Sequence, residues 1–592
     1  MKIQKNISNT FNTNCKKILF FISFIFVFIE SNKSYEGVFF AQNLLNYYKF
    51  NNSYNAFFET IKNAEFTMQI FFPYLLLKLG LNFYITNFII NTIIINISIF
   101  SIYFLSQILT KKKIVSFSIP IILIFFGLIN SRWYGIKYPI SFFYFGQLGM
   151  YLFILSASLF VLNKKILSYH FLIIGFFCHA AWGLLTAVFI MLYFFLKKDK
   201  IKIPSFGNLI VFLIFLLITI FSLTDLKKNN LDYKKTTSTL TNFYGKFEET
   251  SSEELNKFKT THKVKLLINQ DPFKTSFNLL RFYSFDLIFV IIFLLELKKK
   301  QNTKQKFFWV CSVIWASIHI YNIFDVLIIE FISLFSVFLG GLIDRIIPTR
   351  FLNFINVLVT IYCLNILLTN NNLAVIYFKF FFITVSIILL IFFRDAPINI
   401  GYFENINLNI LSIFFLLIYF LALFPVNLGE HFDKYKNLNQ NFYIFLFVFF
   451  SLNVVLMAYE SFKDYRENKN LFTNNINIKK TMLYGGNVYG RINANYYLNI
   501  PLLVMVNPQF PFYNRKIYDD IFCNRLKKTF EDQHSYFDYI NNNCFAEKTN
   551  LEWLNFKKLL DIEYVLVPNH VKLDLPILGK TEKFLLYLIK SN

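Results

Sequence analysis

Two carboxylates follow the first apolar segment of the chain, at a position where they could take a proton from a hydroxyl group. The segment reads KKILFFISFIFVFI over residues 16–29, and Glu30 and Glu36 come directly after it. A carboxylate held at such a boundary can act as a general base. A lone Glu in this position is more often a solvated loop residue, so the assignment of Glu36 depends on the pattern around it.

A pair of arginines forms a second candidate site. The stretch GLIDRIIPTRF at 341–351 places Arg345 and Arg350 on either side of Pro348, at the edge of an apolar run. The planar guanidinium presents a fork of donors that matches phosphate oxygens. The alternative is a basic flank of a membrane span or a contact with lipid headgroups, which is the commoner role of arginines in this setting.

Four further residues are candidates for contact with a sugar or another acceptor. Arg132, Tyr134 and Lys137 share a short loop, where the aromatic ring could stack on a sugar or mark the membrane interface. His179 lies inside an apolar run, where an ionisable group is costly in lipid, although a neutral packed His is the commoner case. No His, Asp or Glu spacing is typical of a metal site, so we expect no cofactor; binding of a divalent metal stays an alternative that no sequence feature supports.

The elements that must position these residues are apolar helices. Hydrophobic residues make up 56% of the 592 residues and charged residues 16%, against about 25% charged in soluble domains. The charges gather between long apolar runs, which predicts an all-α polytopic membrane protein with about 12–14 transmembrane helices. The 59 Lys and Arg against 35 Asp and Glu fit orientation by the positive-inside rule, so we expect a bilayer and no nucleic acid as partner.

We expect a membrane domain over residues 1–459, with a first external loop at 30–83 and a polar external loop at 225–281. The first span is uncleaved, residues 66–82 lie along the membrane surface, and 169–196 form a tight hairpin with its tip near His179. Other spans are expected at about 84–108, 114–130, 140–162, 206–224, 283–297, 307–325, 327–343, 351–369, 373–393, 408–425 and 441–459.

Residues 460–592 are expected to form a small soluble α/β domain. The stretches IPLLVMV at 500–506 and EYVLVP at 563–568 are typical of short buried strands. Cys523 and Cys544 are the only cysteines of this tail, which favours a disulfide and an external, oxidising location. The basic residues Lys463, Arg466 and Lys469 favour the inside instead, and we expect the tail to be external.

The first loop resembles that of a known family. Y-E-G-V-F-F-A-Q-N-L-L places Glu36 before an apolar helix, and F-F-P-Y-L-L-L-K-L-G at 71–80 follows before the second span. This pattern is similar to the acidic motif and the proline-containing closing segment of the GT-C superfamily of polyprenyl-phosphate-dependent glycosyltransferases, which include dolichyl-phosphate-mannose-dependent mannosyltransferases. The family's first acid is replaced here by Tyr35, and its first closing proline by Phe72.

The resemblance implies a glycosyltransferase of the cell (inner) membrane. Such an enzyme moves a sugar from a polyprenyl-phosphate donor to a lipid, glycan or protein acceptor at the external face. Glu36, or Glu30 in its place, would be the base, and Arg345 and Arg350 would bind the donor phosphate. Three alternatives remain: an O-antigen polymerase or ligase-like protein, a transporter or flippase, and a membrane protein without catalysis. The first usually has its long loop late in the chain, and the second usually has internal repeats.

Overall fold

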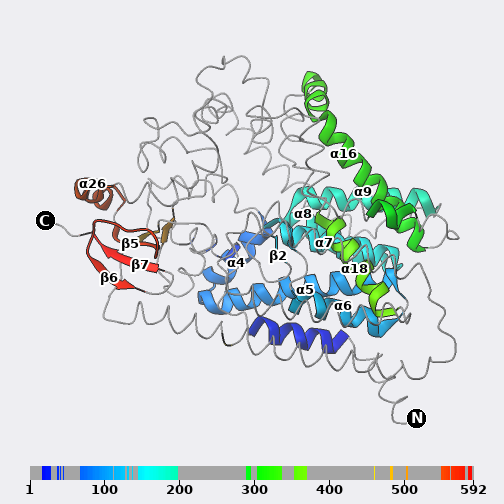
Figure 1. The fold of residues 1–592 in the computed structure, drawn as a ribbon, viewed down its shortest axis with the longest axis horizontal. Coiled ribbons are helices and arrows are strands. Elements are labelled where there is room, and N and C mark those ends of the chain that lie inside the picture. The colour runs from blue at the N-terminus through cyan, green and yellow to red at the C-terminus, as the bar shows by residue number, and fades with distance from the viewer. Residues whose placement is uncertain are drawn as a thin grey trace, which may run out of the picture. The chain divides into compact units, whose positions relative to one another are not determined.

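The computed structural model describes two parts of the chain, a helical part and a small sheet domain (Figure 1). The described residues are 16–28, 67–110, 112–126, 130–131, 136–137, 145–197, 289–294, 303–335, 353–369, 481–484, 502–504, 548–560, 562–580 and 584–589, with a few isolated positions besides. Two compact units divide the chain: residues 1–28, 92–213 and 270–457 form one, and residues 29–91, 214–269 and 458–592 form the other.

The helical part consists of long apolar helices with polar residues at their ends. Residues 16–28 form the first helix. The labelled helices are α4 (Met68–Lys78), α5 (Phe83–Leu109), α6 (Lys113–Phe126), α7 (Phe145–Val161), α8 (Lys165–Cys178), α9 (Ala180–Lys197), α16 (Thr303–Phe335) and α18 (Asn353–Thr369). Helices were therefore predicted correctly at 84–108, 114–130, 140–162 and 351–369, where α5, α6, α7 and α18 lie.

The surface segment expected at 66–82 is a separate short helix. The 11 residues of α4 end at a left-handed turn, where Gly80 has a φ of +92°. The Leu81 amide donates back to the Leu76 carbonyl at 3.2 Å, as in a Schellman cap. Asn82 then caps α5, because its Oδ1 accepts the Ile85 amide at 2.8 Å. The sequence L-G-L-N thus encodes one helix end and the next helix start.

Residues 165–197 form the predicted helical hairpin. His179 adopts an extended backbone between α8 and α9, with φ −163° and ψ 96°. At the other end of the pair, Lys197 Nζ donates to Asn163 Oδ1 at 2.9 Å, and the Lys165 ammonium lies 5.1 Å from the centroid of the Phe194 ring. The two helices are therefore antiparallel, and the prediction of a hairpin with its tip near His179 is confirmed.

One expected boundary is wrong. Spans were predicted at 307–325 and 327–343 with a break between them, yet α16 continues from Thr303 to Phe335 as one helix of 33 residues. In the sequence, Asp325 and Glu330 interrupt the apolar run near the expected break, but both have ordinary helical backbone preferences. No Gly or Pro occurs within α16, so nothing in its backbone chemistry ends the helix there.

The helices pack through aromatic rings and small polar side chains. Phe153 of α7 contacts the rings of Trp182, Phe189 and Phe354, with centroids 5.7, 5.9 and 5.2 Å away. Ser156 Oγ donates to the Ser168 carbonyl and Ser168 Oγ to the Ser156 carbonyl, each at 2.8 Å. This reciprocal pair joins α7 to α8. The helices α5 and α9 are long and apolar enough to cross a membrane.

The C-terminal domain holds a mixed five-stranded sheet in the order β4-β3-β5-β7-β6. Its strands are β3 (Thr481–Tyr484), β4 (Leu502–Val504), β5 (Ile562–Pro568), β6 (Ile577–Lys580) and β7 (Phe584–Leu588). The first three are parallel, and β5, β7 and β6 are antiparallel neighbours. The predicted strands at 500–506 and 563–568 correspond to β4 and β5, so the α/β prediction is confirmed, while β3, β6 and β7 were not predicted.

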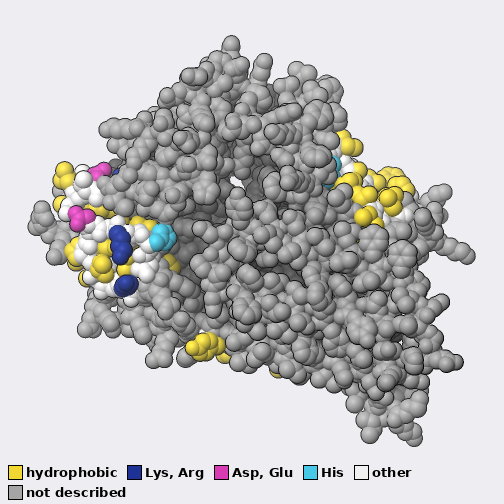
Figure 2. Space-filling view, viewed as in Figure 1, with side chains coloured by type: hydrophobic (Ala, Val, Ile, Leu, Met, Phe, Trp, Pro, Cys, Tyr) yellow, Lys and Arg dark blue, Asp and Glu magenta, His cyan; other side chains and the backbone are white. Residues whose placement is uncertain are grey.

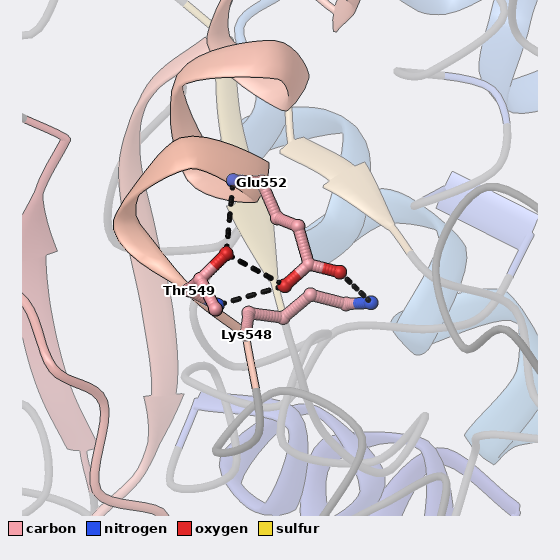
Figure 3. A network of polar contacts seen from close by, with 3 residues as sticks. All are labelled: Lys548, Thr549 and Glu552. Atoms are coloured by element: carbon pink, nitrogen blue, oxygen red, sulfur yellow. Dashed lines mark hydrogen bonds and ion pairs between the residues drawn. The ribbon is translucent and has the colours of Figure 1, made fainter.

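Helix α26 (Asn550–Leu560) precedes β5 and begins with a capping box (Figure 3). The Thr549 amide donates to Glu552 Oε2 at 2.8 Å, and the Glu552 amide donates to Thr549 Oγ1 at 3.4 Å. The hydrogen bonds from the Thr549 amide, which has the largest effect, and from the Thr549 hydroxyl, at 3.0 Å from Oε2, lower the pKa of the Glu552 carboxyl, and Lys548 lies 3.6 Å away as an ion-pair partner. The first turn of α26 is thus fixed locally, by side chains four positions apart or fewer.

Candidate functional site

Most of the predicted site residues lie outside the described part of the chain. This applies to Glu30, Glu36, Arg345 and Arg350, and to Arg132 and Tyr134. The cysteines Cys523 and Cys544 and the polar loop 225–281 also lie outside it, as do the spans expected at 206–224, 373–393 and 408–425 and nearly all of the one at 441–459. Of the predicted site residues, the structure describes the backbone of Lys137 and the side chain of His179.

Lys137 belongs to a small β-hairpin between α6 and α7. Strand β1 (Asn130–Ser131) pairs antiparallel with β2 (Ile136–Lys137), and Asn130 is the partner of Lys137. The hairpin follows α6 and leads into the first turn of α7. The short loop predicted here is therefore a turn that reverses the chain between two helices.

Six lysines of the helical part lie at the ends of these helices that are remote from the β1–β2 hairpin. The ammonium groups of Lys16 and Lys164 both lie over the Phe104 ring, near the end of α5. Lys112 Nζ donates to the Thr369 carbonyl at 3.4 Å, at the end of α18. We call this the basic end, defined by Lys16, Lys112, Lys113, Lys164, Lys165 and Lys197.

His179 lies at the end of α8 that is remote from the basic end, next to the first two turns of α7. A Cβ on Gly146 would lie 4.0 Å from His179 Nε2, so the imidazole faces the start of α7. A Cβ on Gly149 would lie 2.6 Å from Trp182 Cδ1 and 2.8 Å from His179 Cβ. These separations are too short for real contacts, so only Gly at 149 permits this approach of the hairpin tip to α7.

The tip of the helical hairpin is itself tightly packed. A Cβ on Gly183 would lie 2.8 Å from Phe176 Cα, so α8 and α9 meet nearly backbone to backbone. Trp182 is 2% exposed, whereas His179 is half-buried. A half-buried imidazole beside a rigid indole can bind a polar ligand through one ring nitrogen.

Sequence reasoning found His179 but missed Gly146, Gly149, Gly183 and Trp182. The signal was present in G-Q-L-G at 146–149, where two glycines three residues apart lie on one helix face. Small residues at this spacing allow helices to approach closely in membranes. The contact partner of that face could not be predicted, because it comes from the hairpin tip some thirty residues later.

Cys178, Cys311 and Cys363 are buried, and among the described residues they form no disulfide. Within the described ranges, no group of three His, Cys, Asp or Glu side chains is arranged to hold a metal ion.

Comparison with protein-family models, curated proteins and solved structures finds no significant match.

Proposed function

We propose that this chain is a polytopic membrane glycosyltransferase, which moves a sugar from a polyprenyl-phosphate donor to a lipid, glycan or protein acceptor at the external face of the cell membrane. The proposal has two parts: that the helical part is embedded in lipid, and that the face remote from the basic end carries the chemistry. Each part is supported by different residues.

The membrane part is supported by which side chains the helices bury. In α5 the polar residues Asn87, Ser98 and Ser106 are buried, while Ile85 and Ile93 are 46% and 40% exposed. Figure 2 shows apolar side chains on the surface where α16 lies in Figure 1, and Trp309 and Ile320 of α16 are 43% and 55% exposed. Helices with small polar residues inside and large apolar residues outside are typical of membrane bundles.

The basic end supports the same conclusion. Its lysines come from the start of residues 16–28, from the turns α5–α6 and α7–α8, and from the end of α9. Lysines of successive turns are expected on one side of a membrane if the helices between them cross it in pairs. By the positive-inside rule this side is cytoplasmic, which makes the side of His179 and the β1–β2 hairpin external.

The enzymatic part is carried by one observation, the break between α4 and α5. At about 1.5 Å per residue, the 11 residues of α4 are too short for a hydrocarbon core of about 30 Å. This short helix has Pro73 inside it, is followed by Gly80 and a long apolar helix, and lies in the segment whose sequence resembles the closing segment of the GT-C superfamily. The loop closed by this segment contains Glu36.

In the proposed reaction an acceptor hydroxyl attacks the anomeric carbon of the donor sugar. The bond from that carbon to the phosphate oxygen breaks, the polyprenyl phosphate leaves, and Glu36 takes the hydroxyl proton. Arg345 and Arg350 would stabilise the charge on the departing phosphate. Arg132, Tyr134, Lys137 and His179 would contact the sugar or acceptor. No metal or other cofactor takes part in this scheme.

The test is sugar release from the donor in proteoliposomes that contain the purified full chain, a panel of polyprenyl-phosphate-linked hexoses and a mixture of lipids and glycans that supplies the acceptor hydroxyl. Glu36→Gln keeps the size of the side chain but removes the base, so release should fall about 10²–10⁴-fold with donor binding retained. Arg350→Lys keeps the charge but loses the fork, so donor binding should weaken. Glu552→Gln, which changes an exposed carboxylate of the C-terminal domain, is the matched control and should leave release unchanged.

Full activity in Glu36→Gln would move the base to Glu30. Full activity in both Glu36→Gln and Glu30→Gln would leave the loop without a base. In that case a transporter, or a membrane protein without catalysis, would account better for the sequence.

A further inference from the structure

Two lysines from distant parts of the sequence converge on one aromatic ring at the basic end. Lys16 Nζ lies 5.6 Å and Lys164 Nζ 4.8 Å from the centroid of the Phe104 ring. The first lysine begins the helix of residues 16–28, and the second precedes α8. Three separate helices thus bring two like charges together, although like charges repel each other.

The α7–α8 turn fixes the position of Lys164. Asn163 has a φ of 61°, in the left-handed region, and the Lys164 amide donates to the Leu159 carbonyl at 2.8 Å. Asn163 Oδ1 also accepts the Lys197 ammonium at 2.9 Å, which ties the turn to the end of α9. Lys164 therefore approaches Lys16 from a turn with defined hydrogen bonds.

No carboxylate compensates this pair among the described side chains. Among the described side chains of residues 16–369, none belongs to Asp or Glu. The ion pair that the described residues do form, between Lys548 and Glu552, belongs to the C-terminal domain. Cation–π contact offsets only part of the repulsion between two ammonium groups.

Both lysines are exposed, so a ligand can reach them. Partial burial and the neighbouring Lys16 charge lower the pKa of the Lys164 ammonium from its ordinary value, which is the expected effect of a nearby like charge. An anion placed between the two ammonium groups would remove the repulsion.

We propose that Lys16 and Lys164 form a phosphate-binding site at the basic end of the helical part. The phosphate would come from the headgroup of an anionic phospholipid or from a soluble phosphate. The site is separate from the proposed sugar transfer, because it lies at the end of α8 remote from His179. It does not depend on any residue of the proposed catalytic reaction.

The test is calorimetric titration of the full chain in uncharged detergent, at low salt, with dioctanoyl phosphatidic acid and separately with inorganic phosphate. The double variant Lys16→Gln and Lys164→Gln should bind about tenfold to thirtyfold more weakly, given the usual contribution of two basic residues near an anionic lipid. Lys113→Gln removes an equal charge from an exposed position at the same end and should change little. Lys16→Arg with Lys164→Arg keeps both charges and should preserve binding.

The two ligands distinguish the sources. Binding of phosphatidic acid alone would assign the site to a lipid headgroup, and competition by inorganic phosphate would assign it to soluble phosphate. The proposal is overturned if neither ligand binds, or if Lys113→Gln weakens binding as much as a single Lys16→Gln or Lys164→Gln change, since the attraction would then be a general property of the basic end.

Discussion

The helical part and the C-terminal sheet domain both bury apolar side chains, but they expose different kinds of side chain. In α9 the polar Thr186 is buried with its apolar neighbours, while Leu184 and Phe195 are 49% and 78% exposed. After β5 the exposed positions are charged instead: Val571 and Leu573 are buried, and the alternating Lys572 and Asp574 are exposed. Both patterns follow if lipid surrounds the helical part and water surrounds the sheet domain, because apolar side chains are favourable in lipid and charged side chains are favourable in water.

The side chains that each part exposes indicate what that part can bind. A helical part that exposes apolar residues all along its helices can hold a lipid-linked donor, because the lipid tail stays in the bilayer. A sheet domain with an apolar core and exposed charged residues requires only water as its surrounding solvent. The basic end adds a direction, because its lysines mark one end of the helices and His179 marks the other.

The largest expected effect comes from placing a charge on the exposed apolar surface of each part. Ile93→Arg puts a charge near the middle of α5, at a position 40% exposed, and should cost about 2.5–3.5 kcal/mol of insertion if lipid covers it. Leu551→Arg, at a position 69% exposed in the C-terminal domain, should stay within about 0.5 kcal/mol of the parent. Membrane-fraction yield and thermal stability of both variants measure this, and equal tolerance at the two positions would abolish the distinction.

A smaller effect is expected at the capping box of α26. Thr549→Ala removes the hydroxyl that accepts the Glu552 amide and should destabilise the helix start by about 1 kcal/mol, read as faster amide exchange in α26. Thr549→Ser retains the hydroxyl and should exchange like the parent. A rate increase of the same size in α9 would show that the substitution acts on the whole chain.

The same box predicts a dependence on pH. The folded pKa of Glu552 is lowered below its ordinary value of 4.5, so the carboxylate stabilises α26 above that value. This contribution is lost as the pH falls through the lowered folded pKa. Protection of α26 should therefore decrease in acid, and Glu552→Gln should flatten that part of the profile. An unchanged profile in Glu552→Gln would assign the acid sensitivity to other groups.

The smallest effect is expected from the serine pair between α7 and α8. Ser156 and Ser168 exchange two hydrogen bonds of 2.8 Å through their hydroxyls and carbonyls. Ser156→Ala and Ser168→Ala should each destabilise the protein by about 0.6 kcal/mol, the usual size for interhelical bonds in membrane proteins, and the two losses should be nearly additive, because each hydroxyl donates to a backbone carbonyl that alanine retains. No loss of stability in either single variant would mean that the pair only permits close packing.

The sequence predicted features that are encoded locally. The end of α4 at Gly80, the start of α5 at Asn82 and the hairpin tip at His179 each depend on a few neighbouring residues. Strands β4 and β5 were visible as short apolar runs. Asp325 and Glu330 misled the assignment of a break, because a charge within an apolar run is costly in lipid without ending a helix.

Features formed by distant residues were not predictable. In the sequence β6 lies between β5 and β7, yet in the sheet β7 pairs directly with β5. The sheet order therefore depends on pairing between strands that are not consecutive. The approach of Gly149 to His179 and Trp182 joins α7 to the hairpin tip, and the convergence of Lys16 and Lys164 joins two ends far apart in sequence. In each case one partner has no local signal that identifies the other.

The central claim is that the helices separate a basic side of a membrane from a side that carries the chemistry. It is tested most directly by single cysteines at the two ends of α5, Leu79→Cys before it and Lys113→Cys after it, in a chain whose six native cysteines are replaced by Ala. Both positions are exposed, and Leu79 is 80% exposed. In sealed right-side-out vesicles a membrane-impermeant maleimide should label Leu79→Cys, and Lys113→Cys should react only after the vesicles are opened. Labelling of both cysteines from one side would contradict the account.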